Sequence, residues 1–75
     1  GAMIKQTLEW HRFGDIGPAE EKDCLLIPRK AWDEIVIAHT TWKTEGLVWC
    51  SNAMADFDVD DTDLWAYWNE PKEET

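Results

Sequence analysis

The six tryptophans in this chain of 75 residues are the feature that most constrains its fold. One buried tryptophan removes about 150–250 Å² from water, whereas a domain this short buries only about 60% of its unfolded surface. Without a disulfide framework or a metal motif, a few large side chains must supply the core. We therefore expect three or four of the six to be core or sheet-face residues. They are Trp10, Trp32, Trp42, Trp49, Trp65 and Trp68.

The chain is expected to form one small domain over residues 4–71. Residues 1–3, Gly-Ala-Met, have the form of a scar left by tag cleavage, and the acidic residues 72–75 are expected to fray. The apolar stretches are far shorter than the roughly 20 residues of a membrane helix, and no signal peptide is evident. We therefore expect a cytoplasmic protein with free thiols at Cys24 and Cys50.

The distribution of β-branched and aromatic residues predicts a mainly β fold, with a small α+β fold as the alternative. Strands are expected over residues 24–27, 35–42, 47–50 and 64–68, joined into one antiparallel meander of three or four strands. Residues 51–63 are expected to form a loop or short helix. A helix over residues 60–70 is the alternative to the last strand, because Asp60 could cap it. Central pairing of the first two strands would place Ile37 in the core.

The negative charge is concentrated in the C-terminal part of the chain. Residues 1–43 carry seven acids and six bases, whereas residues 44–75 carry nine acids and only Lys72. A net charge of −9 disfavours contact with nucleic acid and with anionic membranes, both of which require Lys and Arg. The natural complement is a protein with a basic surface, although charge also keeps a small domain soluble.

The last predicted strand carries aromatic side chains on both of its faces. Alternation places Leu64, Ala66 and Trp68 on one face and Trp65 and Tyr67 on the other. A single sheet layer cannot bury both faces, so some rings should be exposed or covered by a partner or a second copy. Exposed Trp and Tyr are common interface hot spots, and we expect Trp42, Trp65 and Tyr67 to bind a partner.

A run of aspartates precedes that strand and is expected to contribute to the same partner surface. Its members are Asp56, Asp58, Asp60, Asp61 and Asp63. A calcium loop starting at Asp56 would need Gly at its sixth position and an acid at its twelfth, where the chain has Asp61 and Tyr67. We therefore expect no metal site. A row of carboxylates could instead imitate DNA phosphates, which makes a DNA-mimic inhibitor the alternative function.

No pattern of catalytic residues is evident in the sequence. His39 lies inside the strongest predicted strand, where a structural histidine is the commoner interpretation, and His11 is the only other histidine. A dyad of His39 with Cys24 or Cys50 is compatible with the spacing, but nothing else favours it. We expect a protein that is not an enzyme and that needs no cofactor.

The order of short motifs resembles a small domain of unknown function common in phage and prophage proteins. The motifs are Trp10, the Gly17-Pro18 turn, CLLI at 24–27, IVIA at 35–38, VW at 48–49 and AYWNEP at 66–71. The resemblance covers residues 8–72 and includes a C-terminal Trp-Pro motif. It implies a small β-rich fold and a phage accessory role in the host cytoplasm, and it implies no activity or catalytic residues.

These observations together predict a small acidic accessory protein that acts by non-catalytic binding. The expected partner is a host or defence protein with a basic surface, which the chain would modulate or inhibit. A homodimer is also compatible with the aromatic faces.

Overall fold

A computed structural model describes residues 3–30, 34–68 and 72–74 of the chain. Within these ranges every regular element is a β-strand, which confirms the mainly β prediction and the strand, rather than helix, near residue 65. The strands are β1 Met3–Lys5, β2 His11–Arg12, β3 Cys24–Ile27, β4 Val36–Lys43, β5 Gly46–Ser51, β6 Phe57–Asp58, β7 Leu64–Tyr67 and β8 Lys72–Glu74. No helix among the described residues has the length and apolar character needed to cross a bilayer.

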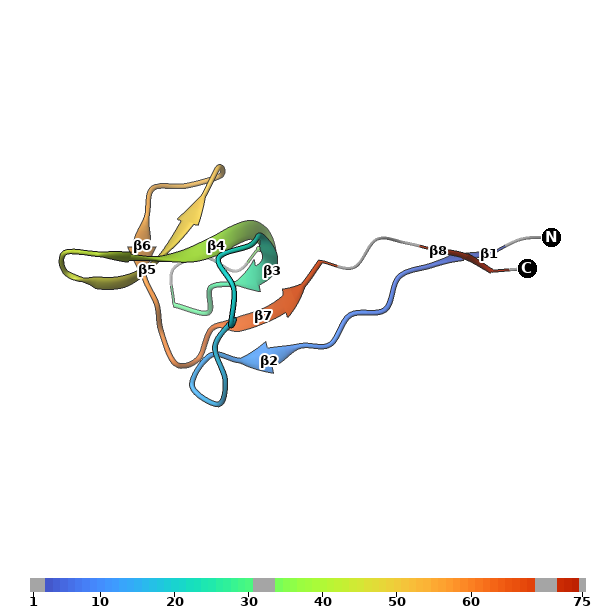
Figure 1. Cartoon of the computed structure of the whole chain (residues 1–75), viewed down its shortest axis with the longest axis horizontal. Helices are drawn as coiled ribbons and strands as arrows, with labels where there is room; N and C mark the ends of the chain where they lie inside the picture. The colour runs from blue at the N-terminus through green and yellow to red at the C-terminus, as the bar shows by residue number, and fades with distance from the viewer. Residues whose placement is uncertain (1–2, 31–33, 69–71, 75) are drawn as a thin grey trace.

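Six strands form one antiparallel sheet in the order β2-β7-β3-β4-β5-β6 (Figure 1). The predicted antiparallel sheet is therefore present, but its strand order differs from a meander. Strands β3, β4 and β5 follow one another, and β7 returns to lie beside β3, which is the Greek-key arrangement. The physical reason lies in the register, because pairing with β3 sets Trp65 opposite Leu26, and both side chains are buried.

Strands β1 and β8 form a separate two-stranded ribbon that carries both termini away from the body of the molecule (Figure 1). This ribbon accounts for much of the 51 Å length of the molecule, which measures 24 × 19 Å in its other directions. Within the tail that is expected to fray, Lys72–Glu74 forms a strand that pairs with Met3–Lys5. Thr75 lies outside the described residues.

The core lies on one face of the curled sheet. Its fully buried rings are Trp49 and Trp65, and Phe13 packs edge-on against Trp49 with ring centroids 5.8 Å apart. The smaller core residues are Cys24, Leu26, Val36 and Ala38. Of the five tryptophans in the described residues only these two are buried. Trp42 lies on a sheet face in β4, so three tryptophans are core or sheet-face residues, within the three or four expected. Trp32 lies outside the described ranges.

Side chains alternate strictly between the two faces of β4. Val36, Ala38 and Thr40 are buried, whereas Ile37 points the other way and is 55% exposed. The expectation that Ile37 lies in the core is therefore wrong. Neighbouring side chains in a strand point to opposite faces, so only one member of the Val36–Ile37 pair can enter the core.

Candidate functional site

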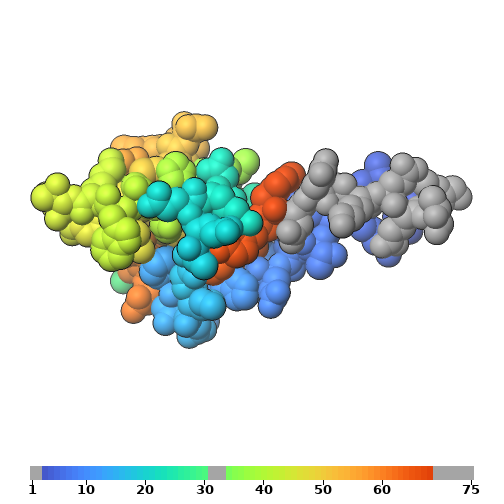
Figure 2. Space-filling view, in the orientation of Figure 1, coloured from blue at the N-terminus to red at the C-terminus, as the bar shows by residue number. Residues whose placement is uncertain are grey.

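The clearest candidate for a binding site is a groove between the β4–β5 hairpin and the segment that follows β2. We call it the hairpin groove; it has a volume of about 380 Å³. Figure 2 shows the two walls side by side, the hairpin in yellow-green at the left end and the segment in cyan beside it. The groove is lined by Phe13, Gly17, Pro18, Ala19, Glu20, Glu21, Thr40, Trp42 and Leu47.

Trp42 supplies the largest apolar surface of the groove. It pairs with Leu47 near the tip of the hairpin, beyond the point where β4 covers the core. The tight turn that closes the hairpin is made possible by Gly46, whose φ of 130° is rarely adopted by other residues. The Trp42 ring is consequently 74% exposed, and it offers a rigid apolar surface without contributing to the core.

The opposite wall of the groove is held in place by two aromatic side chains of β7. The Trp65 indole Nε1 donates a hydrogen bond of 2.8 Å to the carbonyl oxygen of Ile16. The Ala19 backbone N–H donates a bond of 2.8 Å to the hydroxyl of Tyr67, which is half-buried. Trp65 is only 2% exposed, so the expectation that it contacts a partner directly is wrong. Both residues instead fix the position of the wall that faces Trp42.

Glycine at position 17 allows this wall to lie directly on a core ring. A Cβ atom there would come within 3.1 Å of two carbon atoms of the Phe13 ring, closer than nearly all real contacts. Pro18 follows immediately and removes further backbone freedom. The wall is therefore largely pre-organised before any partner binds.

The rim of the hairpin groove is acidic. Glu20 and Glu21 both line it. Lys22 lies 3.3 Å from Glu20 and 4.4 Å from the centroid of the Tyr67 ring, but the ion pair is exposed and therefore contributes little. The groove thus combines an exposed aromatic ring with carboxylates, a combination suited to a partner that presents apolar and basic side chains together.

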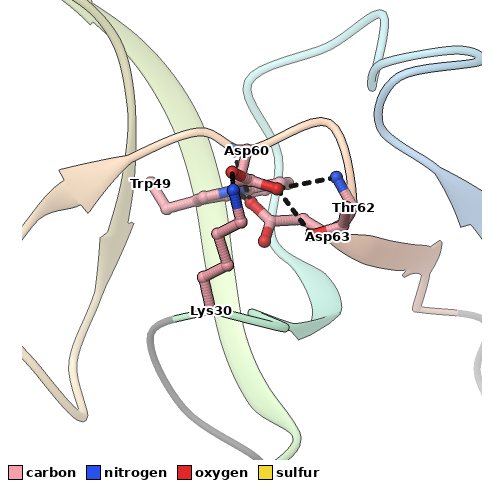
Figure 3. Close-up of polar contacts among 5 residues, drawn as sticks. All are labelled: Lys30, Trp49, Asp60, Thr62 and Asp63. Atoms are coloured by element: carbon pink, nitrogen blue, oxygen red, sulfur yellow. Dashed lines mark hydrogen bonds and ion pairs between the residues drawn. The ribbon is translucent and has the colours of Figure 1, made fainter.

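The aspartate run does not form a free row of carboxylates, because its last member is buried. Asp63 is 1% exposed, and one of its oxygens accepts hydrogen bonds from the Trp49 indole at 2.8 Å and the Asp60 backbone N–H at 2.9 Å (Figure 3). Asp60 in turn accepts from the Thr62 backbone N–H and hydroxyl and lies 3.1 Å from Lys30. These bonds from Thr62 first, and then from Lys30, lower the pKa of Asp60 to about 2.

The remaining three aspartates are on the surface. Asp56 forms an ion pair with Lys43, and this hydrogen bond lowers the pKa of the Asp56 carboxyl. Asp58 and Asp61 are exposed. Of the five aspartates proposed as partner contacts, Asp63 is therefore a buried structural residue, and Asp56 and Asp60 are engaged with lysines of their own chain.

The structure brings His39 and Cys50 together as cross-strand partners on the face of the sheet opposite the core. The Nδ1 atom of His39 is 3.3 Å from a carboxylate oxygen of Asp23. However, partial burial, followed by the charge of Asp56, raises the pKa of the Cys50 thiol. A nucleophilic cysteine needs a lowered pKa, so this geometry does not favour thiolate chemistry.

The two cysteines are free and lie on opposite faces of the sheet. Cys24 is buried in the core, where its thiol donates to the Ala38 carbonyl oxygen at 3.4 Å. Burial raises the pKa of Cys24 to about 11. Within the described ranges, no three His, Cys, Asp or Glu side chains are grouped closely enough to hold a metal ion.

Sequence reasoning selected Trp42 but missed the other wall of the hairpin groove. The segment containing Gly17, Pro18, Glu20 and Glu21 has the composition of an ordinary charged turn. Only its contact with the distant β7 strand places it opposite Trp42. The closest available signal is the Gly17-Pro18 pair, which indicates a fixed bend.

Comparisons of the chain with protein-family models, with curated proteins and with solved structures find no match.

Proposed function

We propose that this protein acts by non-catalytic binding to a protein that presents a basic and apolar surface, and that the hairpin groove is the binding site. The observation that carries the proposal is the Trp42 ring, which is 74% exposed in a groove that also contains Glu20 and Glu21.

The chemistry of the groove supports binding through one aromatic side chain together with the carboxylates beside it. A tryptophan that becomes desolvated at an interface often contributes 2 kcal/mol or more of binding free energy. Carboxylates beside it select lysine or arginine in the partner and oppose acidic competitors. The net charge of −9 would also speed encounter with a basic protein at low salt.

The fixed wall of the groove lowers the cost of binding. The segment that faces Trp42 is already tied to β7 through Trp65 and Tyr67. Binding therefore loses less conformational entropy than it would if this segment were a loose loop. The reason is that the immobilisation of interface segments opposes association.

The partner follows from the resemblance to phage-encoded domains, which would make it a host or defence protein that the chain modulates or inhibits in the host cytoplasm. Mimicry of DNA is less favoured, since Asp56, Asp60 and Asp63 contact groups of their own chain. A mimic surface needs its carboxylates directed at the partner.

The test is affinity capture from host lysate followed by measurement of dissociation constants for the captured protein. Trp42→Ala should weaken binding about 30-fold, which corresponds to roughly 2 kcal/mol, without lowering the denaturation midpoint. Trp10→Ala is the matched control, because Trp10 is 38% exposed and does not line the groove. Glu20→Gln with Glu21→Gln should reduce both the affinity and its salt dependence.

Two outcomes would contradict the proposal. The first is equal affinity for the wild type and Trp42→Ala. The second is a loss of binding in a variant that carries Asp58→Asn and Asp61→Asn while the groove variants bind normally, which would favour mimicry.

A further inference from the structure

Strand β4 extends beyond its neighbour β3, and this leaves part of one β4 edge without a partner strand. The ladder between β3 and β4 ends at the Cys24–Ala38 pair. The ladder on the other side of β4 continues to the Lys43–Gly46 pair with β5. Among the described residues, the edge of β4 that faces β3 therefore has no strand beside it over residues 39–43.

The turn of the β4–β5 hairpin determines which backbone groups lie on that edge. Only residues 44–45 separate Lys43 from Gly46, so this closing pair exchanges both of its hydrogen bonds across the hairpin. Bonded and non-bonded pairs alternate along an antiparallel ladder, so the N–H and C=O groups of Trp42 and Thr40 point away from β5. In the described part of the chain, the backbone bonds outside the strand ladders involve neither residue. We call the backbone groups of Thr40 and Trp42 the free edge of β4.

The free edge lies in the hairpin groove, because both of its residues line that groove. Immediately before β3 the chain is still beside β4, since Asp23 contacts His39. Further back the chain turns towards β7, where the Ala19 N–H is bonded to the hydroxyl of Tyr67. The hairpin groove therefore lies where a longer β3 would have paired with β4.

An unpaired strand edge is a template for an extended peptide, which can add to the sheet as a further strand. The peptide residue opposite Trp42 would exchange both hydrogen bonds with it, and the residue two positions along would do the same with Thr40. Side chains directly opposite each other lie on the same face, so an apolar side chain there would contact the Trp42 ring. Glu20 and Glu21 on the facing wall favour basic residues in the same segment. A helix is less suited, because its own backbone groups are already bonded to one another.

We propose that the hairpin groove takes an extended segment of the partner, containing apolar and basic residues, as an additional strand on the free edge of β4. This inference rests on the function proposed above, since it specifies how a partner occupies the same groove. Main-chain hydrogen bonds would supply part of the affinity, while Trp42 and the two glutamates would set the sequence preference.

The probe is a capped peptide of about six residues in which valine and lysine alternate, titrated into the isotope-labelled whole chain and followed by NMR. At saturation, hydrogen exchange of the Thr40 and Trp42 amides should slow about tenfold or more, because both become bonded. The Lys43 amide is the internal control, since it is already bonded to β5 and should change little. NOE signals from the Trp42 amide to the peptide backbone should accompany the protection.

Two N-methylated peptides test whether the contact is made by the main chain. One is methylated on the valine nitrogens and the other on the lysine nitrogens, so each has a single edge blocked, because successive N–H groups of a strand point to opposite edges. One of the two should bind about tenfold or more weakly than the parent peptide, through loss of bonds to the free edge. The other should bind like the parent.

Three outcomes would overturn strand addition. The first is no binding of the parent peptide at about 10 mM, and the second is binding that leaves exchange of the Thr40 and Trp42 amides unchanged. The third is equal affinity for both methylated peptides and the parent. Failure of the function proposed above has a different signature, namely equal affinity of the captured protein for the wild type and Trp42→Ala. A captured protein that depends on Trp42 but leaves the two amides unprotected would refute strand addition alone.

Discussion

Replacement of Asp63 by alanine should destabilise the domain more than replacement of any other aspartate in the 56–63 run. One oxygen of Asp63 accepts hydrogen bonds from Trp49 Nε1 and from the Asp60 backbone N–H. A hydrogen bond to a charged group contributes about 1.5–3 kcal/mol, so loss of both bonds should cost about 3 kcal/mol or more. A domain of this size has roughly 4–11 kcal/mol of stability in total, so the loss is large.

A graded series of variants tests the reasoning. Both bonds end on the Oδ2 atom, so an asparagine amide oxygen in the same position can still accept both. Asp63→Asn loses only the charge assistance, which accounts for about half of the bond strength, and should cost about 1–2 kcal/mol. Asp58→Ala is the control, since Asp58 is exposed on the edge strand β6 and should change stability by less than about 0.5 kcal/mol.

The assay is urea denaturation followed by tryptophan fluorescence, with midpoints compared at a constant slope. The expected order of midpoints is wild type and Asp58→Ala highest, Asp63→Asn intermediate and Asp63→Ala lowest. Equal midpoints for Asp63→Ala and Asp58→Ala would refute the view that the buried Asp63 carboxylate stabilises the fold through its two hydrogen bonds.

Four further outcomes follow from the geometry. Ile37→Ala should cost less than about 1 kcal/mol, whereas Leu26→Ala should cost about 2–5 kcal/mol in the same denaturation assay, because only Leu26 is in the core. Gly46→Ala should cost about 1–3 kcal/mol through backbone strain alone, since nothing lies within 4 Å of a Cβ there. In an NMR titration the Asp60 carboxyl should have a pKa of about 2, so its contribution to stability is present above pH 4 and is lost as the pH falls towards 2. Cys24 should react with a thiol reagent at pH 8 only when the protein unfolds, as judged by the dependence of the reaction rate on urea.

The positions of the main strands could be predicted because each strand is marked by its own apolar residues and by the residues that flank it. The CLLI segment is flanked by charged residues and Pro28, and the predicted strand 24–27 coincides with β3. The neighbour of the last strand could not be predicted, since local periodicity does not specify pairing. That choice depends on Trp65 meeting Leu26 across the sheet, a contact between residues 39 positions apart in the sequence.

The inward face of β4 is indicated by the whole strand but not by its first two residues. Val36 and Ile37 are both β-branched and apolar, so this pair by itself does not show which side faces solvent. The later residues His39, Thr41 and Lys43 are polar and lie on the Ile37 side. Sequence indicates a face only where apolar and polar side chains alternate. In the last strand both faces are apolar, and this ambiguity concealed that Trp65 is in the core. Trp42 shares the inner face of β4 but is exposed, because it lies near the hairpin tip beyond the core.

Strand β7 positions the hairpin groove from the inner side of the sheet. Trp65 and Tyr67, on its inner side, hold the wall of the hairpin groove, while Ala66, on its other side, is fully buried. Trp42 and Ile37 likewise occupy opposite faces of β4 by alternation. A substitution at Ile37 should therefore leave binding in the groove unchanged, whereas Trp42→Ala should weaken it.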